Sequence, residues 1–118
     1  MKALLVDDNP LYLSLVKNWD VGITTVPTAV DAIEAMNTHH YDMVITDLFM
    51  PLMSGVKLHE FLSERYDTPV VIISDHVDFE MKLNNIKFKY QKPMSKHRLL
   101  EIMEEVKNEN RSKKSLYR

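Results

Sequence analysis

The chain has 118 residues, of which 45% are hydrophobic and 27% charged, and this is the composition of one folded domain rather than of a disordered segment. A net charge of -2 argues against a surface built throughout to bind nucleic acid, and the absence of cysteine excludes disulfides, thiolate zinc sites and a cysteine nucleophile. Signal-peptide and membrane-spanning patterns are missing, so we expect a cytoplasmic domain without a membrane partner.

The first part of the chain alternates short apolar runs with segments of helical periodicity. The run at 3–6 predicts a strand, and Asn9 and Pro10 after it suit the cap and first residue of a helix. A second strand is expected within 21–26, followed by a helix that Thr28 can cap. The residues expected to face the core are Leu11, Leu15, Val16 and Trp19 in the first helix and Val30, Ile33 and Met36 in the second.

The same alternation continues to the end of the chain. Strands are predicted at 43–47, 70–73 and 88–91, and helices from about Val56 to Arg65, at 78–85, and after Ser95. The residues expected to face inward are Leu58, Phe61 and Leu62 in the first of these helices and Leu99, Ile102, Met103 and Val106 in the last. A strand and a helix repeated five times predict a parallel sheet covered by helices on both faces.

Polar side chains stand where the predicted strands end. Asp7 and Asp8 follow the first strand, Asp47 ends the third, Ser74 follows the fourth and Lys92 follows the fifth. Because the carboxyl ends of parallel strands gather at one edge, we expect these residues to share a site. Clustered carboxylates stay ionised at neutral pH when they share a cation, and oxygen ligands with waters suit Mg²⁺. With an ammonium and a hydroxyl beside them, they suit phosphoryl transfer with Asp47 as nucleophile.

Each of these residues also has a simpler explanation when it is taken alone. The acidic pair before Asn9 and Pro10 could be a turn with a helix cap, and Asp47 could be a loop acid. Ser74 could be a turn residue and Lys92 a surface lysine. The simpler explanations weaken together, because all these residues fall at the corresponding ends of four strands.

Over residues 1 to about 107 the chain resembles the receiver domains of the two-component response-regulator family. The resemblance rests on Asp7-Asp8, on the segment DLFMPLMSG at 47–55, on Ser74 and on Lys92-Pro93. It implies a (βα)5 flavodoxin-like, doubly wound fold with a five-stranded parallel sheet of order 2-1-3-4-5. It also implies a cis Lys92-Pro93 bond. We expect a receiver domain at 1–107 and a basic C-terminal tail or the start of a linker at 108–118.

For this chain the resemblance implies a signalling switch rather than an enzyme, with only weak self-phosphorylation and self-dephosphorylation. Asp47 would accept a phosphoryl group from a sensor histidine kinase or a histidine phosphotransfer protein, with Lys92 and Ser74 beside it. Asp8, Asp47 and the backbone carbonyl of Phe49 would ligate Mg²⁺ directly, and Asp7 would act through water. A downstream protein partner would bind the face formed by the fourth helix, fifth strand and fifth helix; homodimerisation is a further option, and nucleic acid is not an expected partner.

Some residues depart from the family pattern. Asp75 follows Ser74 where receivers usually carry a small residue, and it would repel the phosphoryl group, pair with Lys92 or point to solvent. Lys89 occupies the position of the usual aromatic residue, and Tyr90 next to it should face the other side of the sheet unless a bulge shifts the register. The stretch before Lys92 is short by about one helical turn, so we expect a shortened fourth helix and a remodelled face there.

The departures leave a second function open, a degenerate receiver that acts as a phosphorylation-independent protein-interaction module. Asp75, Lys89 and the short fourth helix favour it, whereas the intact acids and Lys92 oppose it. An aspartate-nucleophile phosphatase is disfavoured because Phe49 stands where such enzymes need a second acid. The ring of Phe49 should also hinder an attacking water, which predicts slow self-dephosphorylation.

Overall fold

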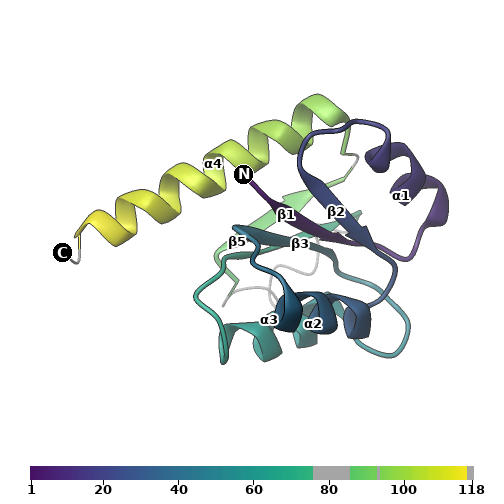
Figure 1. The fold of residues 1–118 in the computed structure, drawn as a ribbon, viewed down its shortest axis with the longest axis horizontal. Coiled ribbons are helices and arrows are strands. Elements are labelled where there is room, and N and C mark those ends of the chain that lie inside the picture. The colour runs from purple at the N-terminus through teal and green to yellow at the C-terminus, as the bar shows by residue number, and fades with distance from the viewer. Residues whose placement is uncertain (76–85, 93, 117–118) are drawn as a thin grey trace.

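The fold is an open parallel sheet with helices on both faces (Figure 1). The computed structural model describes residues 1–75, 86–92 and 94–116. Its strands follow the order β2-β1-β3-β4-β5, which confirms the predicted fold class. They are β1 (Ala3–Val6), β2 (Ile23–Val26), β3 (Met43–Asp47), β4 (Val70–Ser74) and β5 (Phe88–Gln91). The order changes direction between β1 and β3, and in such sheets ligands bind beyond the carboxyl ends of the strands at this point.

The described helices are α1 (Pro10–Lys17), α2 (Ala29–Thr38), α3 (Gly55–Ser63) and α4 (Lys96–Leu116). Side-chain caps explain where the first three begin, because Asn9, Thr28 and Ser54 each accept hydrogen bonds from backbone N–H groups of the first turn. None of the described helices is long and apolar enough to cross a membrane. The helix expected at 78–85 and the expected cis bond before Pro93 fall outside the described residues.

Each face of the sheet carries its own apolar layer. α1 and α4 cover one face and α2 and α3 cover the other (Figure 1). Alternate residues of β1 divide between the layers, with Leu5 on the α1 and α4 side and Leu4 on the α2 and α3 side. The central strands β1, β3 and β4 are buried on both faces, which accounts for their nearly unbroken apolar sequences.

The buried faces of α1 and α2 differ from the predicted ones. Val16 is buried and Trp19 packs against the core as expected, but Leu11 and Leu15 are 81% and 52% exposed. Tyr12 and Leu13 pack inward instead, so the helix is rotated by about one residue from the expected stripe. In α2 the prediction was wrong at Val30, which is 59% exposed. Met36 is buried and Ile33 packs against the core as predicted, and the buried Ala29 and Ala32 complete the inward face of α2.

The C-terminal helix α4 packs as its sequence predicts and then continues beyond the expected domain end. Leu99, Ile102, Met103 and Val106 are all buried in the layer that α4 shares with α1. Residues 108–116, expected as a tail or linker, extend the same helix. Figure 1 shows this end of α4 projecting past the sheet. In α3, Leu58 and Leu62 are buried and Phe61 is half-buried.

Candidate functional site

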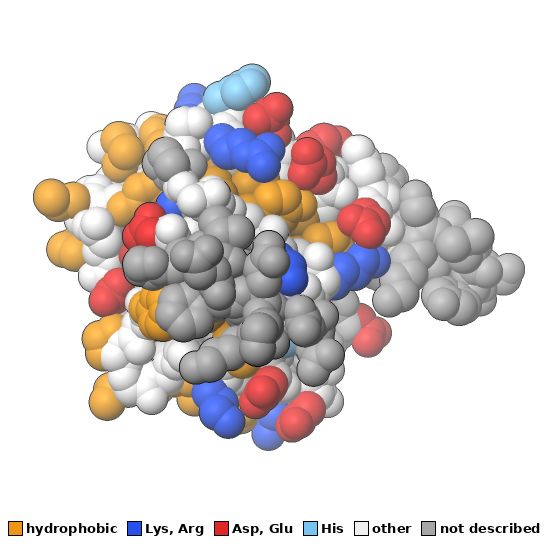
Figure 2. All heavy atoms as spheres, turned by 180° about the vertical axis from the view of Figure 1, so that it is seen from behind, with side chains coloured by type: hydrophobic (Ala, Val, Ile, Leu, Met, Phe, Trp, Pro, Cys, Tyr) orange, Lys and Arg blue, Asp and Glu red, His pale blue; other side chains and the backbone are white. Residues whose placement is uncertain are grey.

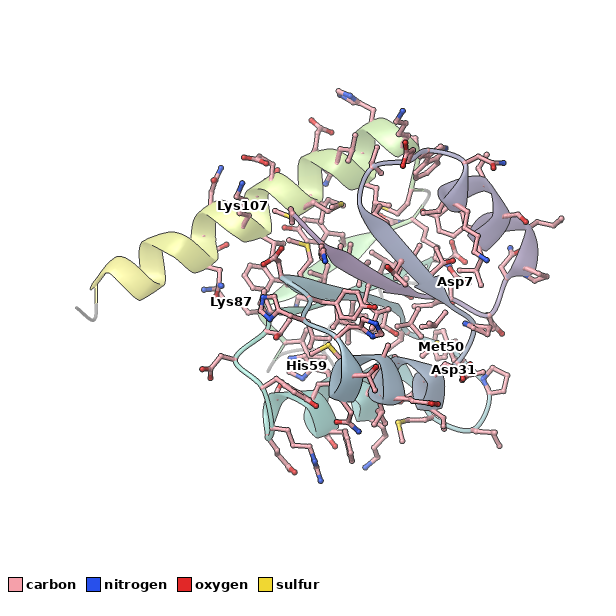
Figure 3. The ribbon with its side chains drawn as sticks, in the orientation of Figure 1. Asp7, Asp31, Met50, His59, Lys87 and Lys107 are labelled. Atoms are coloured by element: carbon pink, nitrogen blue, oxygen red, sulfur yellow. The ribbon has the colours of Figure 1, made fainter. Side chains whose placement is uncertain are left out.

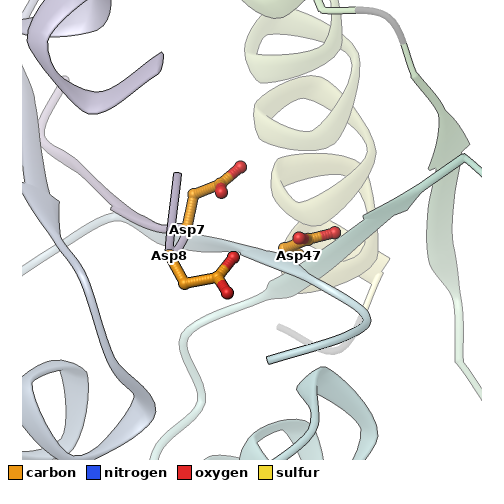
Figure 4. A group of neighbouring side chains, drawn as sticks. All are labelled: Asp7, Asp8 and Asp47. Atoms are coloured by element: carbon orange, nitrogen blue, oxygen red, sulfur yellow. The ribbon is translucent and has the colours of Figure 1, made fainter. Parts of the chain in front are cut away.

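The acidic residues predicted to converge do so at the carboxyl edge of the sheet (Figure 4). Asp7, Asp8 and Asp47 each offer a carboxylate oxygen, and these oxygens lie within 4.8 Å of one another. β1 and β3 pair in parallel with Val6 opposite Thr46, so the residues that follow these positions stand side by side. Asp7 is buried, Asp47 is partly buried and Asp8 is exposed, which leaves the cluster open to solvent on one side.

Lys92 brings a positive charge between two of these carboxylates. Its Nζ lies 3.3 Å from Oδ1 of Asp47 and 3.4 Å from Oδ2 of Asp7. Burial disfavours the charge on Lys92, but the two carboxylates outweigh burial and raise the pKa of the ammonium. Burial raises the pKa of the Asp47 carboxyl, while Lys92 lowers it and Asp7 raises it further. The ammonium therefore compensates only part of the cost of keeping carboxylates together here.

Backbone groups hold the carboxylates of Asp7 and Asp47 in place. The Leu48 N–H donates to Oδ1 of Asp47 at 3.0 Å, and the Asn9 N–H donates to Oδ1 of Asp7 at 2.9 Å. The first turn of α3 lies against the end of β3, and a Cβ at Gly55 would collide with the carbonyl oxygen of Asp47. A glycine is needed at this position because nothing larger than hydrogen fits between the helix and the strand.

Ser74, Phe49 and Asp75 occupy the surroundings of the cluster. Ser74 is 5% exposed and ends β4, and its carbonyl accepts a hydrogen bond from the Lys92 N–H at 2.9 Å. The side chain of Phe49 is half-exposed. Asp75 is exposed, and the ion pairs of Lys92 within the described part of the chain are those with Asp7 and Asp47. The exposure of Asp75 favours the alternative in which it points to solvent.

Tyr90 and Lys89 face opposite sides of the sheet, as strand alternation predicts. β4 and β5 pair without a bulge, with Ile72 opposite Lys89 and Ile73 opposite Tyr90. Tyr90 packs on the layer beneath α4, and its hydroxyl donates to Glu105 of α4 at 3.2 Å. Burial, together with Glu105, raises the pKa of Tyr90. The side chain of Tyr90 is therefore tied to α4.

Tyr12 of α1 was not predicted to belong to the site. Its hydroxyl donates to the carbonyl oxygen of Met94 at 3.1 Å, across 82 positions of sequence. Its ring meets Trp19 edge-on with 6.3 Å between the ring centres. Burial first, and then the charge of Asp7, raises the pKa of Tyr12 to about 12. The i, i+4, i+7 spacing of positions 12, 16 and 19 could have indicated that Tyr12 faces inward, although not its partner.

Exposed hydrophobic side chains lie near this edge. In Figure 2 they stand out on the side of the molecule away from the projecting end of α4. α1 contributes Leu11 and Leu15, and the loop between β3 and α3 contributes Phe49 and the fully exposed Leu52. The site is thus an acidic and cationic cluster with apolar side chains around its rim.

Comparison with protein families identifies the class of protein. The model of the response regulator receiver domain matches residues 3–107, and the chain belongs to this family. Receiver domains of response regulators have a role in two-component signalling, generally as switches, and interact there with histidine kinases or phosphotransfer proteins. The match ends at residue 107, within α4.

Curated relatives resemble this chain over part of their length. "Regulator of RpoS" of Escherichia coli K12 is 42% identical over 78 residues, which are 62% of this chain and 23% of that protein. "Two-component response regulator ARR12" of Arabidopsis thaliana is 37% identical over 84 residues, or 66% of this chain and 14% of that protein. A protein-glutamate methylesterase/protein-glutamine glutaminase of Nitrosospira multiformis is 34% identical over 84 residues, or 66% of this chain and 24% of that protein. The chain therefore spans a quarter or less of each of these relatives.

Solved structures share the fold. The chemotaxis response regulator CheY4 of Vibrio cholerae has a TM-score of 0.75 and 23% identity, covering 89% of this chain and 97% of that chain. The response regulator TrrA of Thermotoga maritima, solved in complex with Mg²⁺-BeF, has a TM-score of 0.74 and 22% identity, covering 90% of this chain and 99% of that chain. At these identities the likeness establishes the fold alone.

Proposed function

We propose that this chain is a phosphorylation-dependent signalling switch that accepts a phosphoryl group on Asp47. The observation that carries the proposal is the position of the Lys92 ammonium between Asp47 and Asp7, at the edge where a third carboxylate, that of Asp8, also lies. An ion pair between Lys92 and Asp47 would not require the further carboxylates of Asp7 and Asp8. Surplus negative charge beside a fixed ammonium suits a site that takes up a divalent cation and then a phosphoryl group.

The residues at this edge fit Mg²⁺. Asp7, Asp8 and Asp47 provide only oxygen ligands, and Asp8 is open to solvent, which leaves room for the waters that Mg²⁺ usually keeps. We propose that Asp8, Asp47 and the Phe49 carbonyl hold the ion directly and that Asp7 acts through water. When bound, the ion would offset the repulsion among the carboxylates and the charge on the phosphoryl oxygens.

The phosphoryl donor would be the phosphohistidine of a sensor histidine kinase or of a histidine phosphotransfer protein. A carboxylate oxygen of Asp47 forms a bond to phosphorus as the phosphorus–nitrogen bond of the donor breaks, and the imidazole leaves with the bonding electron pair. Lys92 would then contact a phosphoryl oxygen, and the Ser74 hydroxyl would donate to another. The apolar rim of α1 and the β3–α3 loop gives a docking protein a surface to cover.

The rest of the proposed role follows from the switch. The chain would act in the cytoplasm, would not be an enzyme beyond weak self-phosphorylation and self-dephosphorylation, and would pass its signal to a protein that binds the face carrying β5 and α4. We do not propose for this chain the methylesterase activity named for one relative, since the chain spans 24% of that protein.

Incubation with Mg²⁺ and phosphoramidate, followed by intact mass measurement, tests the proposal. We expect the mass to rise by one phosphoryl group, the rise to require Mg²⁺, and Asp47→Asn to abolish it. No modification at saturating donor would contradict the proposal and favour a degenerate receiver that acts as a phosphorylation-independent interaction module. The observation that favours such a module is Lys89, which stands in place of an aromatic residue.

A further inference from the structure

We propose that Tyr12 is a positioning residue for Lys92, and that its hydrogen bond to the carbonyl of Met94, two residues further along the chain, keeps the ammonium between Asp7 and Asp47. The inference deepens the proposed function of the site and rests on it. It starts from a contact that joins α1 to Met94, the hydrogen bond from the Tyr12 hydroxyl to the Met94 carbonyl.

Tyr12 is fixed on the acidic side of the site. Asp7 accepts a hydrogen bond from the Asn9 N–H at 2.9 Å, and the Asn9 side chain in turn accepts from the Tyr12 N–H at 3.3 Å. Tyr12 therefore lies in the first turn of a helix whose start is bound to Asp7. Its ring also makes an edge-on contact with the ring of Trp19.

Lys92 is held by a backbone hydrogen bond close to the residue that Tyr12 contacts. Its backbone N–H donates to the Ser74 carbonyl at 2.9 Å, and two residues later the Met94 carbonyl accepts from Tyr12 at 3.1 Å. Met94 is 6% exposed and belongs to the apolar layer under α1 and α4. Contacts therefore link Asp7 through Asn9 and Tyr12 to Met94. Lys92, two residues before Met94 in the chain, contacts Asp7 in turn.

Closing this ring of contacts has a chemical consequence. Charge placed for phosphoryl transfer acts only when it stays within a fraction of an ångström of its position. A buried phenol whose pKa is raised to about 12 remains a hydrogen-bond donor at neutral pH. Without that hydroxyl, Met94 loses this contact with α1, and Lys92, two residues before it, gains freedom to move away from Asp47.

The test compares Tyr12→Phe with Tyr66→Phe. Both changes keep the ring and remove one phenolic hydrogen bond, but Tyr66 donates to Asn37 at 2.6 Å, away from the carboxyl edge. We expect Tyr12→Phe to slow phosphorylation by phosphoramidate about three- to tenfold at saturating donor, which is the range that one hydrogen bond supplies. The Mg²⁺ concentration at half-maximal rate should not change, because the acidic ligands are untouched.

A second measurement does not depend on phosphorylation. Limited acetylation with mass mapping reports how accessible the Lys92 amine is, and we expect its rate to rise severalfold in Tyr12→Phe and to stay at the original value in Tyr66→Phe. If the original protein takes no phosphoryl group, the proposed function fails and the acetylation rates still decide on Tyr12. Equal rates for both variants and the original protein, or an equal change in both variants, would overturn the positioning role.

Discussion

Each edge of the sheet carries a basic side chain close to a carboxylate, at nearly equal distance but in different surroundings. At the carboxyl edge, Lys92 lies 3.3 Å from Asp47, with side chains 20% and 14% exposed; at the amino edge, His40 lies 3.5 Å from Asp42, with side chains 85% and 47% exposed. Burial raises the pKa of Asp47, whereas a hydrogen bond from the Lys2 N–H lowers the pKa of Asp42. A basic group close to a carboxylate is common to both edges, and burial with a surplus of acid marks the edge suited to chemistry.

A hollow of about 590 Å³ lies by the amino edge, where its lining includes Asp42, Tyr66 and Lys107. Figure 3 shows Lys107 on α4 well away from Asp7. The side chains that line this hollow do not include the acidic cluster. Within the described part of the chain, that cluster lies at the carboxyl edge. Convergent charge is therefore the better guide to the site.

The largest expected effect on the phosphorylation rate comes from replacing Lys92 at the carboxyl edge. Lys92→Met should lower the phosphorylation rate about a hundredfold or more, because a fixed cation beside the transferred group is lost. Lys57→Met is the matched control, since it breaks an exposed pair with Glu60 at 3.6 Å on α3 and should leave the rate unchanged. Rates measured with phosphoramidate at saturating Mg²⁺ decide this, and similar rates for both variants would contradict the assignment.

The next difference concerns the affinity for Mg²⁺. Asp8→Asn should weaken Mg²⁺ binding about 10- to 100-fold, and Asp42→Asn, the corresponding change at the amino edge, should not alter it. Calorimetric titration with MgCl₂ measures both. An unchanged affinity in Asp8→Asn would place the ion elsewhere and remove the metal from this edge.

A glycine at each edge allows a comparison of stability with function. Gly55→Ala would press a Cβ against the Asp47 carbonyl, and Gly22→Ala would place one 2.6 Å from the Met1 carbonyl at a φ of +78°. Each should lower the free energy of unfolding by about 1–3 kcal/mol in urea titrations. Phosphorylation should slow in Gly55→Ala alone; a normal rate there would show that the backbone of Asp47 tolerates displacement.

The smallest effect is a dependence of stability on pH at the amino edge. Because the folded-state pKa of Asp42 is lowered below its ordinary value of 3.8, its contribution to stability is present above that pH and is lost as the pH falls through the folded-state pKa. Asp42→Asn should therefore flatten slightly the loss of unfolding free energy below about pH 4. Urea titrations from pH 6 to 3 give the unfolding free energy at each pH. If Asp42 contributes nothing, this free energy will fall with pH equally in the original protein and in Asp42→Asn.

The site could be predicted from the sequence to the extent that topology determines it. Asp7, Asp47 and Lys92 follow or end strands, and parallel pairing then brings them to one edge whatever the details of packing. Tyr12 could not be assigned in this way, because its partner Met94 lies 82 positions away and their contact depends on how α1 is rotated on the sheet. The same rotation, set by packing, explains why Leu11 is exposed.

The central claim is tested most directly by locating the phosphoryl group after reaction with phosphoramidate and Mg²⁺. Borohydride reduction converts a phosphorylated aspartate to homoserine, and tandem mass spectrometry then identifies the position. We expect homoserine at position 47 and unmodified aspartate at Asp7, Asp8 and the amino-edge Asp42. A mark on another residue, or none in a protein shown to be folded, would contradict it.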